Sequence, residues 1–410
     1  MKKLKVSILG AGARGRVLAG AISACDNAEL VSMCDPKEYK LNEVLDFVKK
    51  HHGIEPKAYT DHRRVLESGV DVVIVATDWE HHTELCIECM EKGIIPAVEV
   101  YGAYDIEECW ELVRAYERTG VPLAFLENCC FDRFELLCTA MHRRGMFGDV
   151  VYCHGAYRHN LARDLVNYKG ERANYRGLEY YLRNCETYPT HELGPIAKLL
   201  NINRGNKMLY LTTCASKPGA GLREYAMMEG VLKDKTSALD FKSADIFNTN
   251  IVCTGGELIN IVLDTTLPTY YDREFTVRGT KGMALQTANL VVFEGKEYSL
   301  EEFYEPEKSI AKHMNSANEF NELLPDCWRN LTDEERKLGH GGMDYIQMHT
   351  VFDAIIKGRE MPLDVYDCAS LISITPLSEQ SVAHGGLPQA IPDFTRGKWL
   401  RRKKSDVMPL

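Results

Sequence analysis

The chain has 410 residues, of which 45% are hydrophobic and 26% are charged, a balance typical of a globular protein with two or three domains. Its 49 basic and 59 acidic residues give a net charge of −10, which argues against general binding to nucleic acid or to anionic membranes. No segment approaches the roughly 18 apolar residues of a membrane span. The N-terminus also lacks the long apolar core of a secretion signal, so we expect a cytoplasmic protein.

The first residues predict a strand, a glycine-rich turn and a helix. The β-branched run KVSILG is followed by Gly10, Gly12 and Gly15, which match G-x-G-x-x-G, and then by apolar residues at helical spacing. In this pattern the first glycine permits a tight turn, the second lets a pyrophosphate approach, and the third lets helix and strand pack closely. Ala13 and Arg14 complete the turn, where the helix N-terminus offers free N–H groups to phosphates.

The second predicted strand, AELVSMCD, ends in Asp35. An acid at this distance from the glycines can hydrogen-bond both ribose hydroxyls of a dinucleotide, and it would repel a 2′-phosphate. The cofactor expected from these residues is therefore NAD rather than NADP.

Strands and helices continue to alternate up to Asn128, which predicts a doubly wound parallel sheet over residues 1–128. Glu99 and Asn128 end two of these strands, and in open sheets ligands bind at the carboxyl ends of the strands. The expected strands are 70–76, 94–100 and 122–128, and the expected helices are 81–93 and 105–120. Cys86 and Cys89 form a CxxC inside the first of these helices, but without a second pair at zinc-binding spacing we expect no metal site.

Residues 129–410 predict an α+β domain with a mostly antiparallel open sheet. A helix from residue 134, ended by Gly145, precedes a series of strand-like runs, and the glycines at 255 and 256 suit a hairpin turn. Such a sheet has one face free for a substrate, and we expect the chain to form a homo-oligomer. The expected strands are 149–160, 207–215, 248–255, 257–266, 273–279 and 290–295.

Two groups of side chains in this domain could transfer protons. Strand alternation places Tyr157 and His159 on one face and Arg158 on the other, although spacing alone favours ordinary sheet-face residues. In the stretch YPTHELGP, Tyr188 and His191 lie three residues apart at a helix start, so they share one face. Spacing alone favours the other explanation for His191, a histidine that caps the backbone at the helix start.

The N-terminal half resembles the Gfo/Idh/MocA oxidoreductases, whose members carry an E-K-P motif with a catalytic lysine. Here the stretch VEVYGAY keeps Glu99 but has Val100 and Tyr101 in place of the lysine and proline. The motifs YPTHELGP, GHGGMD and IPDFTRGKW are similar to those of the NAD-dependent glycosidases of glycoside hydrolase family 109, typified by α-N-acetylgalactosaminidase. Two stretches that would shape a sugar pocket depart from that pattern, residues 158–187 and the run TLPTYYDR.

This resemblance implies hydrolysis of a hexoside or N-acetylhexosaminide by transient oxidation. NAD would take hydride from the carbon bearing the 3-hydroxyl, the proton on carbon 2 would then leave, and the aglycone would depart from carbon 1. Water addition and return of the hydride would complete the reaction, so NAD would stay tightly bound and be regenerated in each turnover. By the same resemblance, His191 is the base at the 3-hydroxyl and Tyr157 is the candidate for proton transfer at carbons 1 and 2. Tyr188 positions the sugar or the nicotinamide.

The remaining expectations concern supporting residues. Trp79 and His82 resemble residues that line the nicotinamide, and Arg158 or His159 would supply a cation near Tyr157 and bind substrate. Asp344, in GHGGMD, would contact substrate or orient a catalytic group. The expected partner is thus a small carbohydrate. Two other functions remain open from the sequence: a sugar dehydrogenase that uses exchangeable NAD, and a sensor of sugars or dinucleotides without catalytic activity.

Overall fold

The computed structural model describes residues 3–167, 174–230, 241–295 and 304–410. Its internal contacts divide the chain into two compact units. Unit 1 comprises Met1–Asp132, Pro325–Ser370 and Ser405–Pro409, and unit 2 comprises Arg133–Leu324, Leu371–Lys404 and Leu410. The predicted boundary after residue 128 lies close to the first border, whereas the later returns of the chain to unit 1 fall inside the predicted second domain.

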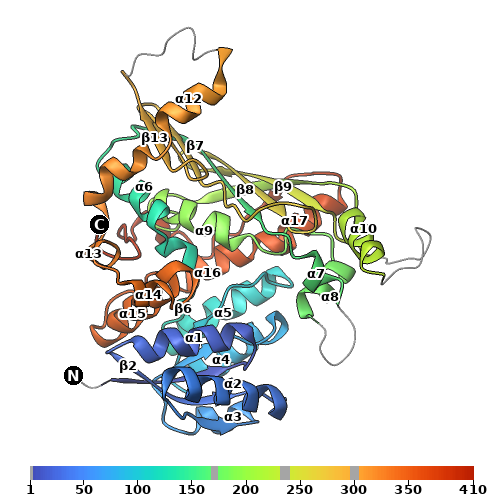
Figure 1. Cartoon of the computed structure of the whole chain (residues 1–410), viewed down its shortest axis with the longest axis vertical. Coiled ribbons are helices and arrows are strands. Elements are labelled where there is room, and N and C mark those ends of the chain that lie inside the picture. The colour runs from blue at the N-terminus through green and yellow to red at the C-terminus, as the bar shows by residue number, and fades with distance from the viewer. Residues whose placement is uncertain (1–2, 168–173, 231–240, 296–303) are drawn as a thin grey trace. The chain divides into compact units, whose positions relative to one another are not determined.

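Unit 1 contains a parallel six-stranded sheet in the order β3-β2-β1-β4-β5-β6, which confirms the doubly wound fold (Figure 1). Its central strand β4 consists of Val and Ile and is fully buried, and the neighbouring β1 is buried from Val6 to Leu9, as helices on both faces of a parallel sheet require. The strands are β1 (Leu4–Leu9), β2 (Ala28–Cys34), β3 (Lys57–Tyr59), β4 (Val72–Val75), β5 (Ile95–Val98) and β6 (Ala124–Phe125).

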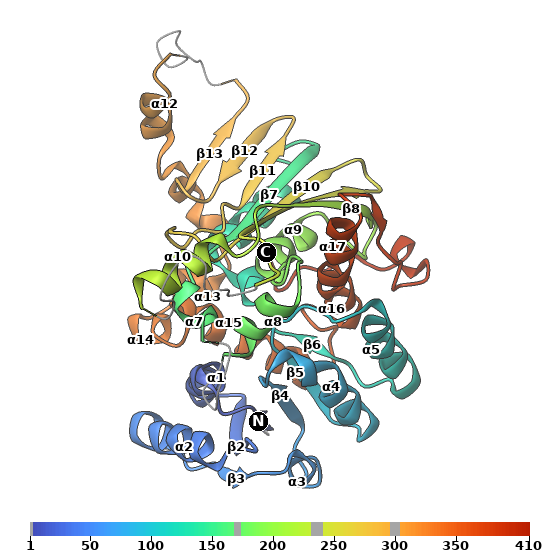
Figure 2. The same cartoon turned by 90° about the vertical axis from the view of Figure 1, so that its right-hand side faces the viewer.

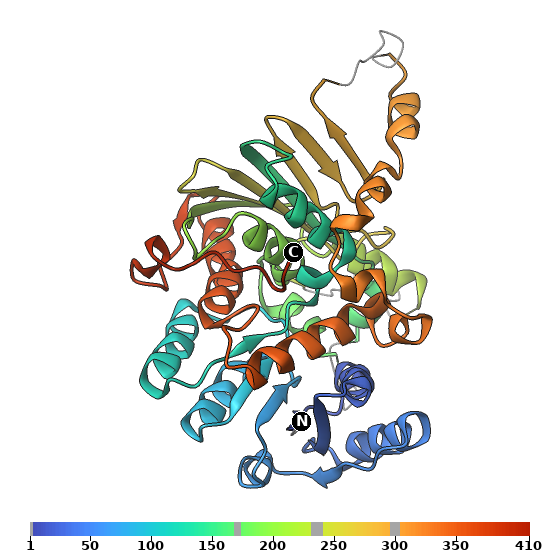
Figure 3. The ribbon, with the colours of Figure 1, turned by 90° about the vertical axis from the view of Figure 1, so that its left-hand side faces the viewer.

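The helices of unit 1 come from both ends of the chain. Helix α15 packs beside α1, and its residues Met348, Val351 and Phe352 join the core formed by the sheet (Figures 1 and 3). The early helices are α1 (Ala13–Ala24), α2 (Glu38–His52), α3 (His62–Leu66), η1 (Trp79–His81), α4 (His82–Glu91), α5 (Ile106–Thr119) and η2 (Asn128–Phe131). The late ones are α13 (Asp326–Arg329), α14 (Asp333–Arg336), η4 (His340–Gly342) and α15 (Met343–Ile356), and α16 (Val365–Ile372) spans the border at Ser370.

Unit 2 contains an eight-stranded sheet in the order β13-β12-β11-β7-β10-β9-β8-β14 (Figure 2). Neighbouring strands are antiparallel except β7 and β10, which confirms the mostly antiparallel prediction. The short strands β12 and β14 were not expected from the sequence pattern. The strands are β7 (Val150–Arg158), β8 (Met208–Ala215), β9 (Ile246–Cys253), β10 (Leu258–Asp264), β11 (Thr276–Gly279), β12 (Gly282–Leu285), β13 (Leu290–Phe293) and β14 (Gln389–Ala390).

One face of this sheet is covered by α9, which packs on β7 and β10, and by α17, which packs on β8. A Cβ on Gly155 of β7 would lie 2.8 Å from the Cβ of Glu192, so glycine permits the close approach of α9. Among the described residues, no helix is both long and apolar enough to cross a membrane. The helices of unit 2 are α6 (Arg133–Arg143), α7 (Ala162–Leu165), α8 (Tyr175–Leu182), α9 (Thr190–Leu199), α10 (Ala220–Met228), α12 (Pro306–His313), η3 (Ser316–Leu323), α17 (Ile374–Ala383) and η5 (Lys398–Leu400).

Candidate active site

The glycine-rich turn has the geometry that a dinucleotide requires. Gly10 has φ +103°, and a Cβ there would lie 2.3 Å from the carbonyl oxygen of Ala76. A Cβ on Gly15 would lie 2.1 Å from the carbonyl oxygen of Gly10, so α1 can pack this closely only because residue 15 is glycine. A Cβ on Gly12, in contrast, would meet no atom within 4 Å. Open space therefore lies at the position where the pattern places a pyrophosphate.

Asp35 follows β2 directly, and backbone hydrogen bonds fix its carboxylate. Oδ2 accepts from the N–H of Ala11 at 2.9 Å and Oδ1 accepts from the N–H of Lys37 at 2.8 Å. These bonds hold the carboxylate at the carboxyl end of β2, beside the glycine-rich turn, where it can accept hydrogen bonds from ribose hydroxyls. Together with the space at Gly12, this arrangement fits NAD and disfavours a 2′-phosphate.

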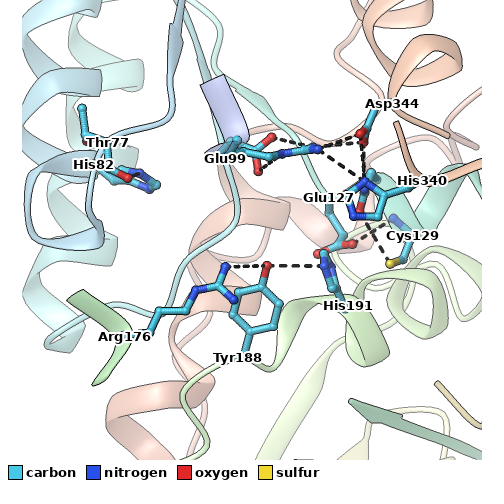
Figure 4. Close-up of polar contacts among 12 residues, drawn as sticks. Thr77, His82, Glu99, Glu127, Cys129, Arg176, Tyr188, His191, His340 and Asp344 are labelled. Atoms are coloured by element: carbon cyan, nitrogen blue, oxygen red, sulfur yellow. Dashed lines mark hydrogen bonds and ion pairs between the residues drawn. The ribbon is translucent and has the colours of Figure 1, made fainter. Parts of the chain in front are cut away.

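Five polar residues of unit 1 form what we term the Arg14 cluster: Arg14, Glu99, Asn128, His340 and Asp344. The guanidinium of Arg14 donates from Nη1 to Oδ2 of Asp344 at 2.7 Å, and its Nε lies 2.9 Å from Oε2 of Glu99. Nδ2 of Asn128 donates to Oδ1 of Asp344 at 2.8 Å, and Nδ1 of His340 lies 2.8 Å from Oδ2 (Figure 4). The structure thus brings four predicted residues together and adds His340, which was not predicted.

The carboxylate of Asp344 is fully buried, yet its surroundings favour the charged form. Burial favours its neutral form, but the charge of Arg14 and the hydrogen bonds from His340 and Arg14 outweigh burial and hold the pKa of Asp344 well below its usual range. Both oxygens of Asp344 have partners in the cluster. This geometry favours the predicted orienting role of Asp344 over direct contact with a substrate.

Trp79 and His82 lie in η1 and at the start of α4, after β4, and both side chains are buried. Nε2 of His82 lies 3.2 Å from the carbonyl oxygen of Thr77 and therefore carries the proton that it donates (Figure 4). The imidazole also packs edge-on against Tyr101, with ring centroids 4.9 Å apart. Burial lowers the pKa of His82 from 6.5 to about 4, so the ring is neutral at physiological pH.

This lowered pKa predicts a loss of stability in acid. Between pH 6.5 and about 4 the unfolded chain protonates His82 while the folded chain does not, so stability falls as the pH falls. The loss should reach roughly 3 kcal/mol near pH 4. The His82→Gln variant keeps a donor for Thr77 but cannot titrate, and its free energy of unfolding should fall less between pH 7 and pH 4. The control is His81→Gln, altered at the exposed neighbour, which should behave like the wild type. If the free energy of unfolding fell equally in the wild type and in His82→Gln, another group would be responsible for the loss in acid.

A second group of predicted residues lies where the end of β7 meets the start of α9 in unit 2. We term Tyr157, His159, Tyr188 and His191 the Tyr–His cluster. The ring centroids of Tyr157 and Tyr188 are 4.8 Å apart, and that of His191 lies 5.4 Å from Tyr157 and 4.8 Å from Tyr188. The hydroxyl of Tyr188 lies 3.4 Å from Nε2 of His191, and that of Tyr157 lies 3.0 Å from Nδ1 of His159. Hydroxyls and imidazoles at these distances can exchange protons with one another and with a bound sugar.

The structure does not bring Arg158 to this cluster. Its Nε donates to Oε1 of Glu274 and its Nη1 donates to Oδ2 of Asp264, each at 2.7 Å, on the opposite face of the sheet. His154 projects from the same face, with Nε2 3.1 Å from Oε2 of Glu274. Successive side chains of a strand point to opposite faces, so Arg158 cannot supply the cation expected beside Tyr157.

Two residues that the sequence analysis missed adjoin the Tyr–His cluster. Cζ of Arg176 lies 4.6 Å from the ring centroid of Tyr188, and its Nη2 is 3.4 Å from the Tyr188 hydroxyl (Figure 4). The ring of Tyr271 lies 6.2 Å from that of Tyr157. No spacing pattern points to either residue, but both occupy the two stretches that depart from the pattern of the related glycosidases.

A buried carboxyl group supports Tyr188 from within the same loop. Glu186 is fully buried, and its Oε1 accepts a hydrogen bond from the N–H of Tyr188 at 3.1 Å. The N–H of Glu186 in turn donates to Oγ of Ser378 on α17 at 2.9 Å. Burial raises the pKa of Glu186, which favours its neutral form and fixes the loop without placing a full charge there.

Solved structures with this fold include an oxidoreductase from Agrobacterium radiobacter in complex with NAD+, L-tartaric acid and magnesium. It matches with a TM-score of 0.67 at 15% identity and covers 95% of this chain and 99% of its own. The myo-inositol dehydrogenase from Lactobacillus casei, in complex with NAD(H) and myo-inositol, matches with a TM-score of 0.63 at 13% identity and covers 95% and 97%. At such identities these likenesses establish the fold alone.

Sequence comparison assigns both parts of the chain. Residues 4–126 match the oxidoreductase family with an NAD-binding Rossmann fold, and residues 131–401 match the C-terminal domain of glycosyl hydrolase 109. A glycosyl hydrolase family 109 protein from Stenotrophomonas maltophilia (strain K279a) is 33% identical over 98% of this chain and 91% of its own length. An alpha-N-acetylgalactosaminidase from Tannerella forsythia is 33% identical over 98% of this chain and 88% of its own length. The chain therefore belongs to glycosyl hydrolase family 109, and its N-terminal part is an NAD-binding Rossmann domain.

Proposed function

We propose that this protein is a redox-neutral, NAD-dependent glycosidase that acts on a hexoside or an N-acetylhexosaminide. The observation that carries the proposal is the approach of Tyr157, Tyr188 and His191 on one buried face, inside the region that matches the family 109 domain. Ordinary glycosidases need two carboxyl groups on either side of the bond that breaks. A tyrosine and histidine set instead suits proton transfer at neighbouring sugar carbons.

When bound, NAD would accept a hydride from the carbon that bears the 3-hydroxyl and would later return it. His191 takes the proton of that hydroxyl as a neutral imidazole and gives it back as the imidazolium, and histidine can hold either form near neutral pH. Tyr157 transfers protons at carbons 1 and 2, and His159 is the hydrogen-bond partner of its hydroxyl. Tyr188 positions the sugar, and the guanidinium of Arg176 packs over the Tyr188 ring and holds it in place.

The replacement of the lysine of related dehydrogenases supports this assignment. Val100 is buried and apolar, and the next residue, Tyr101, is fully buried with its hydroxyl 3.1 Å from Oγ1 of Thr83. Neither residue can replace the lysine as a base, so proton transfer falls to other groups. We propose that NAD stays bound through the cycle and is regenerated in each turnover.

A sugar dehydrogenase is the second candidate, because solved structures with this fold include dehydrogenases.

The test is to incubate the full-length protein with α- and β-linked aryl hexosides and N-acetylhexosaminides while following aglycone release and NADH absorbance. The relative from Tannerella forsythia is named an alpha-N-acetylgalactosaminidase, so aryl N-acetyl-α-galactosaminide is the first substrate to test. Aglycone release without NADH accumulation supports the glycosidase, whereas stoichiometric NADH with intact glycoside supports the dehydrogenase. If no substrate of the panel gave either aglycone release or NADH, the remaining function would be the sensor of sugars or dinucleotides, which has no catalytic activity. The cytoplasmic location and the homo-oligomer stay predictions.

A further inference from the structure

The loop that leads into α9 is held to the rest of unit 2 by hydrogen bonds from its own residues. Oδ1 of Asn184 accepts from the N–H of Ala244, and the N–H of Glu186 donates to Oγ of Ser378, each at 2.9 Å. The N–H of Tyr188 is held within the loop itself, because Oε1 of Glu186 accepts from it at 3.1 Å. Glu186 therefore links the fixed part of the loop to the tyrosine that we assign to the sugar.

The surroundings of Glu186 disfavour a charge on its carboxyl group. The side chain is fully buried, and Oε2 has no hydrogen-bond partner among the described residues. A buried carboxylate is stable where a cation and hydrogen-bond donors compensate for the water that it loses. Asp344 gives the contrast, since it is equally buried but lies against the guanidinium of Arg14, which lowers its pKa. For Glu186, burial raises the pKa to about 8.

The titratable and charged groups around this loop do not supply the missing cation. Tyr180 of α8 and Cys185 of the loop would feel the charge of an ionised carboxyl group, but burial raises the pKa of both, so both are neutral near pH 8. At the end of α8, Nη2 of Arg183 lies 2.6 Å from Oε2 of Glu379 on α17. The guanidinium of Arg176 packs over an aromatic ring of the Tyr–His cluster. Both arginines are thus engaged with other groups.

We propose that Glu186 is a positioning residue that acts in its protonated form and holds the backbone of Tyr188, so that the tyrosine stays in place for the sugar. The neutral carboxyl group accepts the hydrogen bond without placing a charge in the buried loop. When the proton leaves at alkaline pH, the isolated carboxylate must reach water, and the loop that carries Tyr188 moves with it. The inference rests on the proposed function. Because Glu186 lies within residues 158–187, which depart from the pattern of the related glycosidases, we expect the effect in this chain rather than throughout the family.

Two substitutions separate the hydrogen bond of Glu186 from its charge. Glu186→Gln keeps an acceptor for the N–H of Tyr188 on a side chain of the same length, and it cannot ionise. Glu186→Ala removes the acceptor and leaves a buried N–H without a partner. Glu224→Gln is the matched control, because Glu224 is an exposed glutamate of unit 2, on α10.

The first experiment measures kcat and KM of the full-length, NAD-loaded protein at several pH values, with an aryl glycoside of the substrate panel that the wild type cleaves. The wild-type kcat/KM should fall about tenfold from pH 7 to pH 9, because a group with a pKa of about 8 loses its proton. Glu186→Gln should match the wild type at pH 7 and keep that value at pH 9. Glu186→Ala should lower kcat/KM about tenfold at pH 7, mainly through a higher KM. Glu224→Gln should follow the wild type throughout.

Thermal unfolding without substrate tests the protonated state independently of activity. Between pH 4.5 and about 8 the unfolded chain releases the proton of Glu186 while the folded chain keeps it, so stability falls as the pH rises. The unfolding temperature of Glu186→Gln should therefore fall less over this range than that of the wild type or of Glu224→Gln. The same scans show whether Glu186→Ala is folded, and the comparison with Glu186→Gln does not depend on it.

An equal alkaline loss of kcat/KM in the wild type and in Glu186→Gln would overturn the proposal, and so would equal falls in their unfolding temperatures. A loss of kcat/KM at pH 7 as large in Glu186→Gln as in Glu186→Ala would show that the loop needs the carboxyl group itself, and it would also overturn the proposal. Failure of the wild type to cleave any glycoside of the panel would instead contradict the proposed function, and the positioning role would fall with it.

Discussion

Replacing His191 with alanine should reduce glycoside turnover by about 100- to 10,000-fold and leave bound NAD in place. His191 is the imidazole that we assign to the 3-hydroxyl, and loss of a positioned base carries a penalty of this size. It lies in α9 of unit 2, whereas the residues that fit the dinucleotide, Gly12 and Asp35, belong to unit 1. The measurements are the initial rate of aglycone release and the NAD content of the purified variant.

The matched control is His384→Ala. His384 is exposed, belongs to unit 2 and has Nδ1 2.7 Å from the carbonyl oxygen of Gln380 in its own helix region. This control should keep wild-type activity and wild-type NAD content. If His191→Ala retained activity within threefold of the control, His191 would have no place in the mechanism; loss of NAD along with activity would assign it to the cofactor instead.

A valine at Gly12 should weaken NAD binding by roughly 100-fold, equivalent to about 3 kcal/mol, without destabilising the ligand-free protein. Gly12 has extended backbone dihedrals, φ −84° and ψ −171°, which any residue can adopt. A Cβ there meets no atom of the described residues within 4 Å, so we expect valine to displace the pyrophosphate rather than a protein group. Calorimetric titration with NAD and thermal unfolding of the ligand-free variant test the two halves of this prediction.

Gly15→Ala provides the contrast. Its Cβ would lie 2.1 Å from the carbonyl oxygen of Gly10, so this variant should lose stability even without ligand. Because the proposed reaction requires NAD, Gly12→Val should also lose glycosidase activity in proportion to cofactor occupancy. Full activity of Gly12→Val without bound NAD would separate hydrolysis from the dinucleotide and contradict the account.

The sequence predicts the Rossmann half well, because its signals are local. The buried β-branched strands, the glycine spacing and Asp35 each depend on neighbouring residues, and all lie as expected. The short strands β6, β12 and β14 are harder to predict from the sequence, because two to four residues are too few to show an alternation of apolar and polar side chains. The predicted strand at 122–128 is reduced to Ala124–Phe125, and Asn128 begins η2 instead.

The candidate site is predictable only where its members share a local pattern. Tyr188 and His191 occupy one helix start, and Tyr157 and His159 alternate along one strand, so their spacing anticipates their contacts. Arg14 and Asp344 are 330 residues apart, and nothing in the glycine-rich turn indicates that its arginine pairs with a late helix. Long-range contacts of this kind depend on packing between elements, which local periodicity does not encode.

The return of the chain to unit 1 has the same physical origin. Helix α15 is apolar around much of its surface, with Ile346, Met348, Val351 and Phe352 buried, so its sequence predicts burial but does not name a partner. The structure places Met348, Val351 and Phe352 in the core of the parallel sheet. A single boundary near residue 128 follows from the change in pattern there, and the later crossings leave no such change.

The most direct test of the account follows the hydrogen on carbon 2 of the sugar. A glycoside deuterated at that carbon is hydrolysed in ordinary water, and the deuterium content of the released sugar is measured by mass spectrometry. The account predicts that the released sugar has exchanged its carbon 2 deuterium for solvent hydrogen. Complete retention of the label during hydrolysis would show that carbon 2 is never deprotonated, and it would contradict the proposed mechanism.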